Sequence, residues 1–165
     1  MITIDPGVRG AGIAVWSLNN LVMACYVKPM RKDRGYGLAE DLAYNVEMAV
    51  KDYSPKLIVC EFPRFYGSTH QKGDPNDLID VAVAGAAIST RLDSLISYIE
   101  SVFPSDWKGN VPKQKMLVRI WEKLTKEERA VVQKTNKSDR EDILDAIGIG
   151  LWKLGRLNKR IIHNE

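Results

Sequence analysis

The start of the chain alternates between short apolar blocks and turn-forming residues. Apolar blocks cover residues 1–4, 10–16 and 21–27, and Asp5-Pro6-Gly7 and Asn19-Asn20 separate them. Blocks of this length with turn residues between them are typical of antiparallel strands joined by tight turns. We therefore predict three adjacent antiparallel strands at the start of the chain.

A helical period follows these strands and then gives way to a continuous apolar run. The apolar residues that recur every three or four positions over residues 37–53 are Leu38, Leu42, Val46 and Ala49. This period predicts a helix, which Ser54-Pro55 ends. Residues 57–60 are all apolar up to Glu61, as in a strand buried on both faces. This order predicts a crossover into one mixed sheet, and so an α/β fold.

The second half of the chain is mostly helical in pattern. We predict helices over residues 77–93 and 113–124, a strand over residues 96–103, and loops over residues 62–76 and 104–112. Two capping-box signatures predict the starts of two more helices, and they are Thr125 with Glu128 and Ser138 with Glu141. The small residues from Ala82 to Ala87 would let the helix that contains them pack closely on another helix.

The composition narrows the class of protein. The chain has 165 residues and a net charge of +3, which suits one domain over residues 1–165 with a short basic tail. No apolar run approaches the roughly 20 residues that span a bilayer, and the sequence does not begin like a secretory signal. Cys25 and Cys60 lie in apolar runs without metal-ligand spacing, so we expect reduced core thiols and a cytoplasmic location.

Basic residues gather in three groups along the sequence. Concentrated Lys and Arg favour a polyanion as partner, through contacts with phosphates and release of counterions. Each group taken alone is better explained as a solvated surface. The groups are Lys28, Arg31, Lys32 and Arg34; Lys108, Lys113, Lys115 and Arg119; and Lys153, Arg156, Lys159 and Arg160.

Several acidic residues lie at positions where packing of the fold alone does not call for a carboxylate. Asp5 ends the first strand, Glu61 ends an apolar strand, and Asp142 and Asp145 share one helix face. If the strands of Asp5 and Glu61 are parallel neighbours, the last helix can bring its two aspartates to the same place. Carboxylates gathered in this way suit Mg²⁺ or Mn²⁺. Two such ions about 3.5–4 Å apart can hydrolyse a phosphodiester.

Each of these carboxylates also has a structural explanation. Asp5 before Pro6-Gly7 can cap a turn. Glu61 can pair with Arg64 or another cation, and Asp142 suits the first turn of a helix because of the helix dipole. The combination is more specific than any one of its members.

The sequence resembles the RuvC family of Holliday-junction resolvases in the order and spacing of its motifs over nearly the whole chain. The matching segments are Ile4-Asp5-Pro6-Gly7 with Gly12, Val59-Cys60-Glu61, Ala84-Gly85-Ala86-Ala87-Ile88 and the stretch from Asp142 to Ile149. The resemblance implies an RNase H-like fold with a mixed five-stranded sheet flanked by helices. It further implies a homodimer joined largely through the Ala-rich helix, paired symmetric nicks in a four-way DNA junction, and two Mg²⁺ ions bound by Asp5, Glu61, Asp142 and Asp145.

The segment after Glu61 departs from the bacterial members of the family, which usually carry Gln where this chain has Phe62. The stretches from Pro104 to Gly109 and from Pro112 to Gln114 look more like phage-borne relatives. The resemblance suggests that an aromatic residue of the loop, Phe65 or else Tyr66, stacks on a base. The alternative is that the loop aromatics pack under the loop. The full set of expected DNA contacts is Arg64, Phe65, Tyr66, Lys108, Lys113 and Lys115, while His70 and His163 are given no role.

Three other functions compete with the resolvase. A nuclease of the same fold that cuts branched or single-stranded DNA more broadly is the main alternative, because of the departures at Phe62. An actin-like ATPase or sugar kinase also opens with a strand, an acidic residue and glycines, but it needs two such domains. A DNA-binding module without catalysis does not explain the complete carboxylate set.

Overall fold

The computed structural model describes residues 1–31, 35–65, 74–94 and 98–157, and five strands form one mixed sheet in the order β3-β2-β1-β4-β5. The strands are β1 (Ile2–Gly7), β2 (Gly10–Ser17), β3 (Asn20–Val27), β4 (Ile58–Glu61) and β5 (Ile99–Val102). The helices are α1 (Tyr36–Val50), α2 (Pro75–Asp93), α3 (Pro104–Trp107), α4 (Lys113–Lys123), α5 (Lys126–Gln133) and α6 (Arg140–Lys153), with short 3-10 turns η1 (Lys51–Tyr53) and η2 (Lys137–Asp139).

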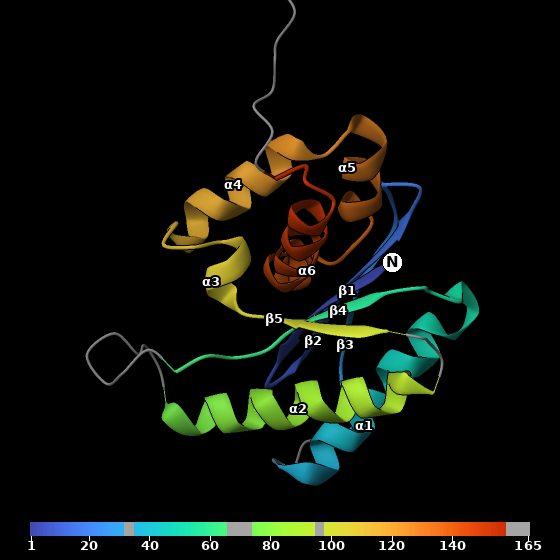
Figure 1. The fold of residues 1–165 in the computed structure, drawn as a ribbon, viewed down its shortest axis with the longest axis vertical. Helices are drawn as coiled ribbons and strands as arrows, with labels where there is room; N and C mark the ends of the chain where they lie inside the picture. Colours follow the sequence, from blue (N-terminus) through green and yellow to red (C-terminus); the bar gives the residue numbers. More distant parts are fainter. Residues whose placement is uncertain (32–34, 66–73, 95–97, 158–165) are drawn as a thin grey trace, which may run out of the picture.

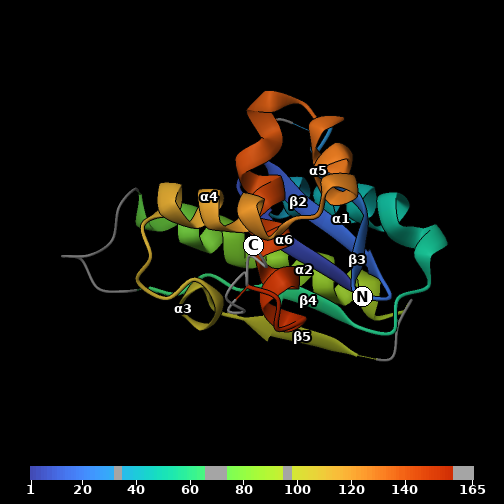
Figure 2. The ribbon, with the colours of Figure 1, turned by 90° about the horizontal axis from the view of Figure 1, so that it is seen from above.

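The sheet lies between two helical layers. Helices α1 and α2 cover one face, and α6 covers the other together with α4 and α5, which Figure 1 shows below and above the sheet. The view from above in Figure 2 places α6 across the middle of the sheet. None of the described helices is long and apolar enough to cross a membrane.

Strand β1 lies at the centre of the sheet and determines where the acidic strand ends fall. It runs antiparallel to β2 and parallel to β4, and Ile4 is the partner of Cys60. The following residues, Asp5 and Glu61, therefore stand side by side at the same edge of the sheet. The predicted hairpin, crossover and mixed sheet are confirmed.

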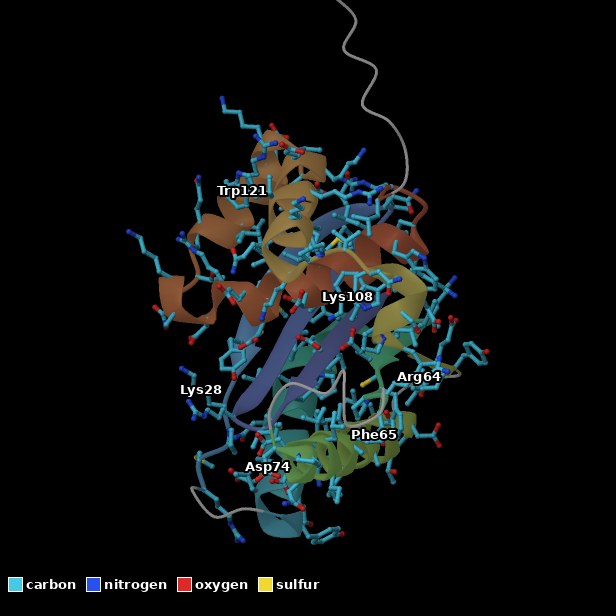
Figure 3. The ribbon with its side chains drawn as sticks, turned by 90° about the vertical axis from the view of Figure 1, so that its left-hand side faces the viewer. Lys28, Arg64, Phe65, Asp74, Lys108 and Trp121 are labelled. Carbon is cyan, nitrogen blue, oxygen red and sulfur yellow. The ribbon has the colours of Figure 1, made fainter. Side chains whose placement is uncertain are left out.

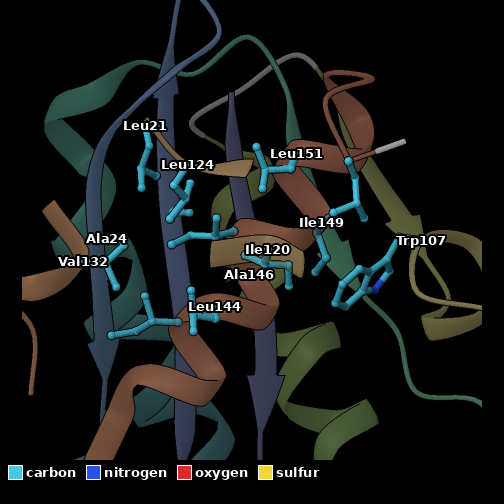
Figure 4. Packing of buried hydrophobic residues seen from close by; sticks show 14 of the residues in the cluster. Leu21, Ala24, Trp107, Ile120, Leu124, Val132, Leu144, Ala146, Ile149 and Leu151 are labelled. Carbon is cyan, nitrogen blue, oxygen red and sulfur yellow. The ribbon is translucent and has the colours of Figure 1, made fainter. Parts of the chain in front are cut away.

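The two-residue period of the strands decides which face each side chain joins. Ile2 and Ile4 of β1 pack in the cluster under α1 and α2, as do Ile58 and Cys60 of β4. The intervening Val59 belongs to the cluster under α6, part of which Figure 4 shows. Asp5 and Glu61 follow the same alternation as Val59, so both carboxylates point to the face that α6 covers.

Helix α6 comes unusually close to the sheet because glycines stand at the contacts. A Cβ atom on Gly12 of β2 would lie 2.1 Å from the carbonyl oxygen of Asp142. A Cβ atom on Gly150 would lie 2.3 Å from the indole of Trp16. A larger residue at either position would push α6 away from the sheet.

Helix starts and loops differ from the prediction at two places. The expected capping box of Thr125 and Glu128 is confirmed, with bonds of 3.2 and 2.9 Å between each side chain and the other's backbone N–H. The expected box at Ser138 is wrong, because the η2 turn comes first and the Ser138 hydroxyl donates to Asp139 instead. Residues 104–112 are not entirely a loop, since they begin with α3.

Candidate metal centre

Asp5, Glu61 and Asp145 share one electrostatic environment. Burial raises the pKa of Asp5 well above its usual range, and the carboxylates of Glu61 and Asp145 raise it further. Burial also raises the pKa of Glu61 and that of Asp145. Such mutual effects require that the carboxyl groups lie near one another, so the structure brings together the acidic residues that the sequence predicted.

Asp142 stands at the rim of this group. It lies in the first turn of α6, one helical turn before Asp145. Burial raises its pKa too, while the ammonium of Lys113 opposes the shift. Asp145 is the more deeply enclosed of the two, with 7% of its surface exposed.

Two lysines face the carboxylates. The ammonium of Lys108 lies 3.8 Å from Oε2 of Glu61, and that of Lys113 lies 3.8 Å from Oδ2 of Asp145. Lys113 also contacts Glu141 at 3.3 Å. Both lysines belong to the second basic group of the sequence, and Lys115 lies exposed on the same helix as Lys113. The cation that pairs with Glu61 is therefore Lys108, whereas the guanidinium of Arg64 lies over the ring of Phe103 at 5.5 Å.

The other two basic groups have members engaged elsewhere. Lys28 pairs with Asp139 at 3.0 Å, and Arg156 pairs with the buried Glu128 at 2.7 Å. Lys153 holds Glu100 on the surface at 2.6 Å. These contacts give Arg156 and Lys153 a structural role, so among the described basic residues those of the second group are the ones that the fold brings to the carboxylates.

Trp107 is a contact of this site that the sequence does not predict. Its indole Nε1 donates a 2.5 Å hydrogen bond to Oε2 of Glu61. The signal available in the sequence was a single bulky aromatic residue next to Lys108 in an otherwise polar segment, which we expected to be a loop. Its partner was not predictable because β5 and α3 bring it to Glu61 from a distant part of the chain.

The aromatic residues after Glu61 lie on the same side of the molecule as the lysines. Figure 3 looks onto this side, with Lys108 near the middle and Arg64 and Phe65 below it. Phe65 is 60% exposed and Phe62 38% exposed. Both residues line an apolar groove of about 460 Å³ along α2, and both side chains are exposed there. Tyr66, His70 and His163 lie outside the described residues.

The donor set suits a hard divalent cation. It consists of carboxylate oxygens, which are the ligands that Mg²⁺ and Mn²⁺ prefer. Among the described contacts of the site, no histidine or thiol takes part. Within the described part of the chain, no three acidic, histidine or cysteine side chains converge closely enough to hold an ion as they stand. This is the arrangement expected of like charges that repel one another and turn toward the ammonium groups of Lys108 and Lys113, whose place a cation would take.

No protein-family model matches the sequence, and no curated protein matches it significantly. Solved structures do match. Thermus thermophilus RuvC in complex with a Holliday-junction substrate is 17% identical, with a TM-score of 0.63 over 94% of this chain and 97% of that chain. A second Thermus thermophilus RuvC structure is 16% identical, with a TM-score of 0.60 over 94% and 98% of the two chains. The yeast mitochondrial Holliday junction resolvase Ydc2 is 14% identical, with a TM-score of 0.53 over 94% and 80%. The mixed five-stranded sheet between helical layers is thus the RNase H-like fold of RuvC.

Proposed function

We propose that this chain is a metal-dependent endonuclease that resolves four-way DNA junctions by paired symmetric nicks. The observation that carries the proposal is the meeting of Asp5 and Glu61, at the ends of two parallel strands, with Asp145 from α6. The likeness in fold to a RuvC bound to a Holliday junction supports the choice of substrate. In this proposal residues 1–165 form one nuclease domain that acts in the cytoplasm.

Asp5, Glu61, Asp142 and Asp145 would hold two divalent ions, Mg²⁺ or Mn²⁺. Such ions activate a water molecule and stabilise the oxygen that leaves the phosphodiester. The raised pKa values of these carboxyl groups mean that binding of a cation would keep them ionised and release protons. Binding of the metal and ionisation of the site are therefore coupled.

Lys108 and Lys113 would place the scissile phosphate. Their ammonium groups lie beside the carboxylates of Glu61 and Asp145. A cation bound by these carboxylates would leave both ammonium groups free to bind phosphate oxygens. Lys115 would contact the phosphate chain farther out along α4. Charge complementarity of this kind orients the DNA backbone without reading its sequence.

The loop after Glu61 would contact the opened centre of the junction. Phe65, or else Tyr66, would stack on an unpaired base, a contact worth about 1–3 kcal/mol. Arg64 would add a phosphate contact beside it. The exposure of Phe65 on the same side as Lys108 supports this arrangement.

A homodimer would supply the second active site that paired nicks require. The outer side of α2 is suited to be its interface, because apolar residues line a groove of about 460 Å³ there. A neighbouring hollow of about 410 Å³ continues it past Val83 and Ala86. Ile79 is 62% exposed at this surface. Sedimentation should show a dimer that Ile79→Glu dissociates and that Val118→Glu, a similarly exposed position on α4, leaves intact.

Cleavage of defined DNA structures tests the function. Purified protein in Mg²⁺ is incubated with four-way junctions, flaps and splayed duplexes that share the same arm sequences. Symmetric nicks in the junction at a much higher rate than in the other substrates support a resolvase. Equal cutting of all three would replace it with the broader branched-DNA nuclease that the departures at Phe62 suggested, and no cutting of any would refute both.

A further inference from the structure

Trp107 joins the strand that carries Glu61 to the helix that carries Asp145. Its indole Nε1 donates to Oε2 of Glu61 at 2.5 Å, and only 4% of its surface is exposed. The ring lies against α6 at Gly148, where a Cβ atom would come within 2.5 Å of the indole Cζ3 atom. One rigid side chain therefore contacts both elements from which proposed metal ligands project.

The contacts of the Glu61 carboxylate fall on one of its two oxygens. Trp107 Nε1 and Lys108 Nζ both face Oε2, at 2.5 and 3.8 Å. Among the contacts of the described residues, Oε1 has no such partner. A glutamate side chain has several rotatable bonds, and a buried, fixed donor on one oxygen selects the orientation in which the other oxygen is available to a ligand.

The indole is itself held in place by its surroundings. It belongs to the apolar cluster under α6, in which Figure 4 shows Trp107 and Ile120. Ile120 of α4 also lies close to Gly148. The start of α3 is fixed by a 2.9 Å bond from the backbone N–H of Phe103 to the carboxylate of Asp106. A donor enclosed in this way loses little freedom when it makes its bond, which favours a role in orienting Glu61.

We propose that Trp107 is a positioning residue of the metal centre, whose N–H holds Oε2 of Glu61 so that Oε1 is presented to a divalent cation. The inference rests on the proposed function, since it concerns the same carboxylates. Trp107 touches neither the substrate nor the ion, and it acts through Glu61. Loss of a donor that orients a ligating carboxylate typically weakens metal binding by about 10–100-fold.

The test measures binding of Mn²⁺ to the protein without DNA, by calorimetric titration. Trp107→Phe keeps an aromatic ring against Gly148 but removes the N–H donor, and it should weaken binding of Mn²⁺ by about tenfold. A second variant replaces Trp107 with benzothienylalanine, in which sulfur takes the place of the N–H group and the shape of the ring system is kept. This variant should show the same loss, and it carries the test if Trp107→Phe does not fold.

Trp16→Phe is the matched control. Trp16 also packs on a glycine of α6, Gly150, and its indole N–H donates at 3.1 Å, but to the hydroxyl of Thr3. This variant loses a similar ring and a similar bond without touching Glu61, so its affinity for Mn²⁺ should stay within about twofold of that of the unmodified protein, well short of the loss expected at an orienting donor.

The outcomes separate the inference from the function on which it rests. Weaker binding in the Trp107 variants alone supports the positioning role. An equal loss in Trp16→Phe, or unchanged binding in the Trp107 variants, overturns it while the nuclease proposal stands. Failure of the unmodified protein to bind Mn²⁺ would overturn the metal centre and the inference together.

Discussion

The hydroxyl of Thr3 donates a 2.7 Å hydrogen bond to the carbonyl oxygen of Ala146. Thr3 lies two residues before Asp5 on the same face of β1, and Ala146 directly follows Asp145 on α6. The bond therefore connects the strand and the helix next to their carboxylates. It also accompanies a bond from the indole of Trp16 to the same hydroxyl, so all three polar groups are satisfied in a fully buried position.

Thr3→Val should destabilise the protein by about 1–3 kcal/mol, because it leaves the Trp16 N–H without a partner inside the core and removes the bond that ties Thr3 to the Ala146 carbonyl. Chemical denaturation measures the free energy of unfolding. Thr135→Val is a matched control, since its hydroxyl makes a bond of the same 2.7 Å length to Val132, but within one turn and only partly buried. That variant should lose about 1 kcal/mol or less. An equal loss in both variants would contradict the role given to the Thr3 bond.

Asp5→Asn should abolish Mg²⁺-dependent cleavage of a four-way junction and leave binding of the junction largely intact. The amide keeps the shape of the side chain but supplies a neutral ligand at the centre of the carboxylate group. Cleavage is followed on gels with labelled arms, and binding by gel shift in EDTA. Asp52→Asn, on the exposed η1 turn, should cleave at the normal rate. Cleavage by Asp5→Asn at the unmodified rate would remove Asp5 from the metal centre.

The contribution of Asp5 to the stability of the metal-free protein should decrease as the pH rises. The pKa of Asp5 in the folded protein is raised well above the usual value of an aspartate, by burial and by Glu61 and Asp145. A group with a raised pKa binds its proton more tightly in the folded state, so its contribution is complete at low pH and is lost as the pH rises through the folded pKa. In EDTA, the unfolding free energy of the unmodified protein should therefore fall relative to that of Asp5→Asn as the pH rises from 4 toward 8.

The comparison with Asp5→Asn is needed because other groups act in the opposite direction. Hydrogen bonds from Arg156 lower the pKa of Glu128 against the effect of its burial, and a bond from Lys28 lowers that of Asp139. Both contributions to stability increase with pH and cancel in the difference. Saturating Mg²⁺ should reduce the effect, since it binds the ionised carboxylates. A difference that does not change with pH would contradict the shared environment of Asp5, Glu61 and Asp145.

The sequence predicted the acidic group because local patterns determine it. An apolar run that ends in Glu61 specifies a buried strand, and the order of elements makes that strand a parallel neighbour of the one that ends in Asp5. The indole bond to Glu61 was not predictable in this way, because it depends on where β5 and α3 place Trp107 in space. The same holds for Arg156, which looked like part of a basic surface and instead pairs with the buried Glu128. Local periodicity cannot reveal a contact between residues that distant elements bring together.

Phe65→Ala should slow cleavage of a four-way junction more than it weakens binding at low salt. Phosphate contacts dominate binding at low salt, whereas a stacked aromatic residue acts on the opened base at the centre of the junction, with a contact worth about 1–3 kcal/mol. Single-turnover cleavage rates and gel-shift titrations measure the two effects separately. Tyr98→Ala is the matched control, because Tyr98 is 61% exposed, close to the 60% of Phe65, and precedes β5 at the end of the sheet away from Glu61. Tyr98→Ala should leave both measurements unchanged, and a normal cleavage rate in Phe65→Ala would assign the stacking contact to another residue of the loop.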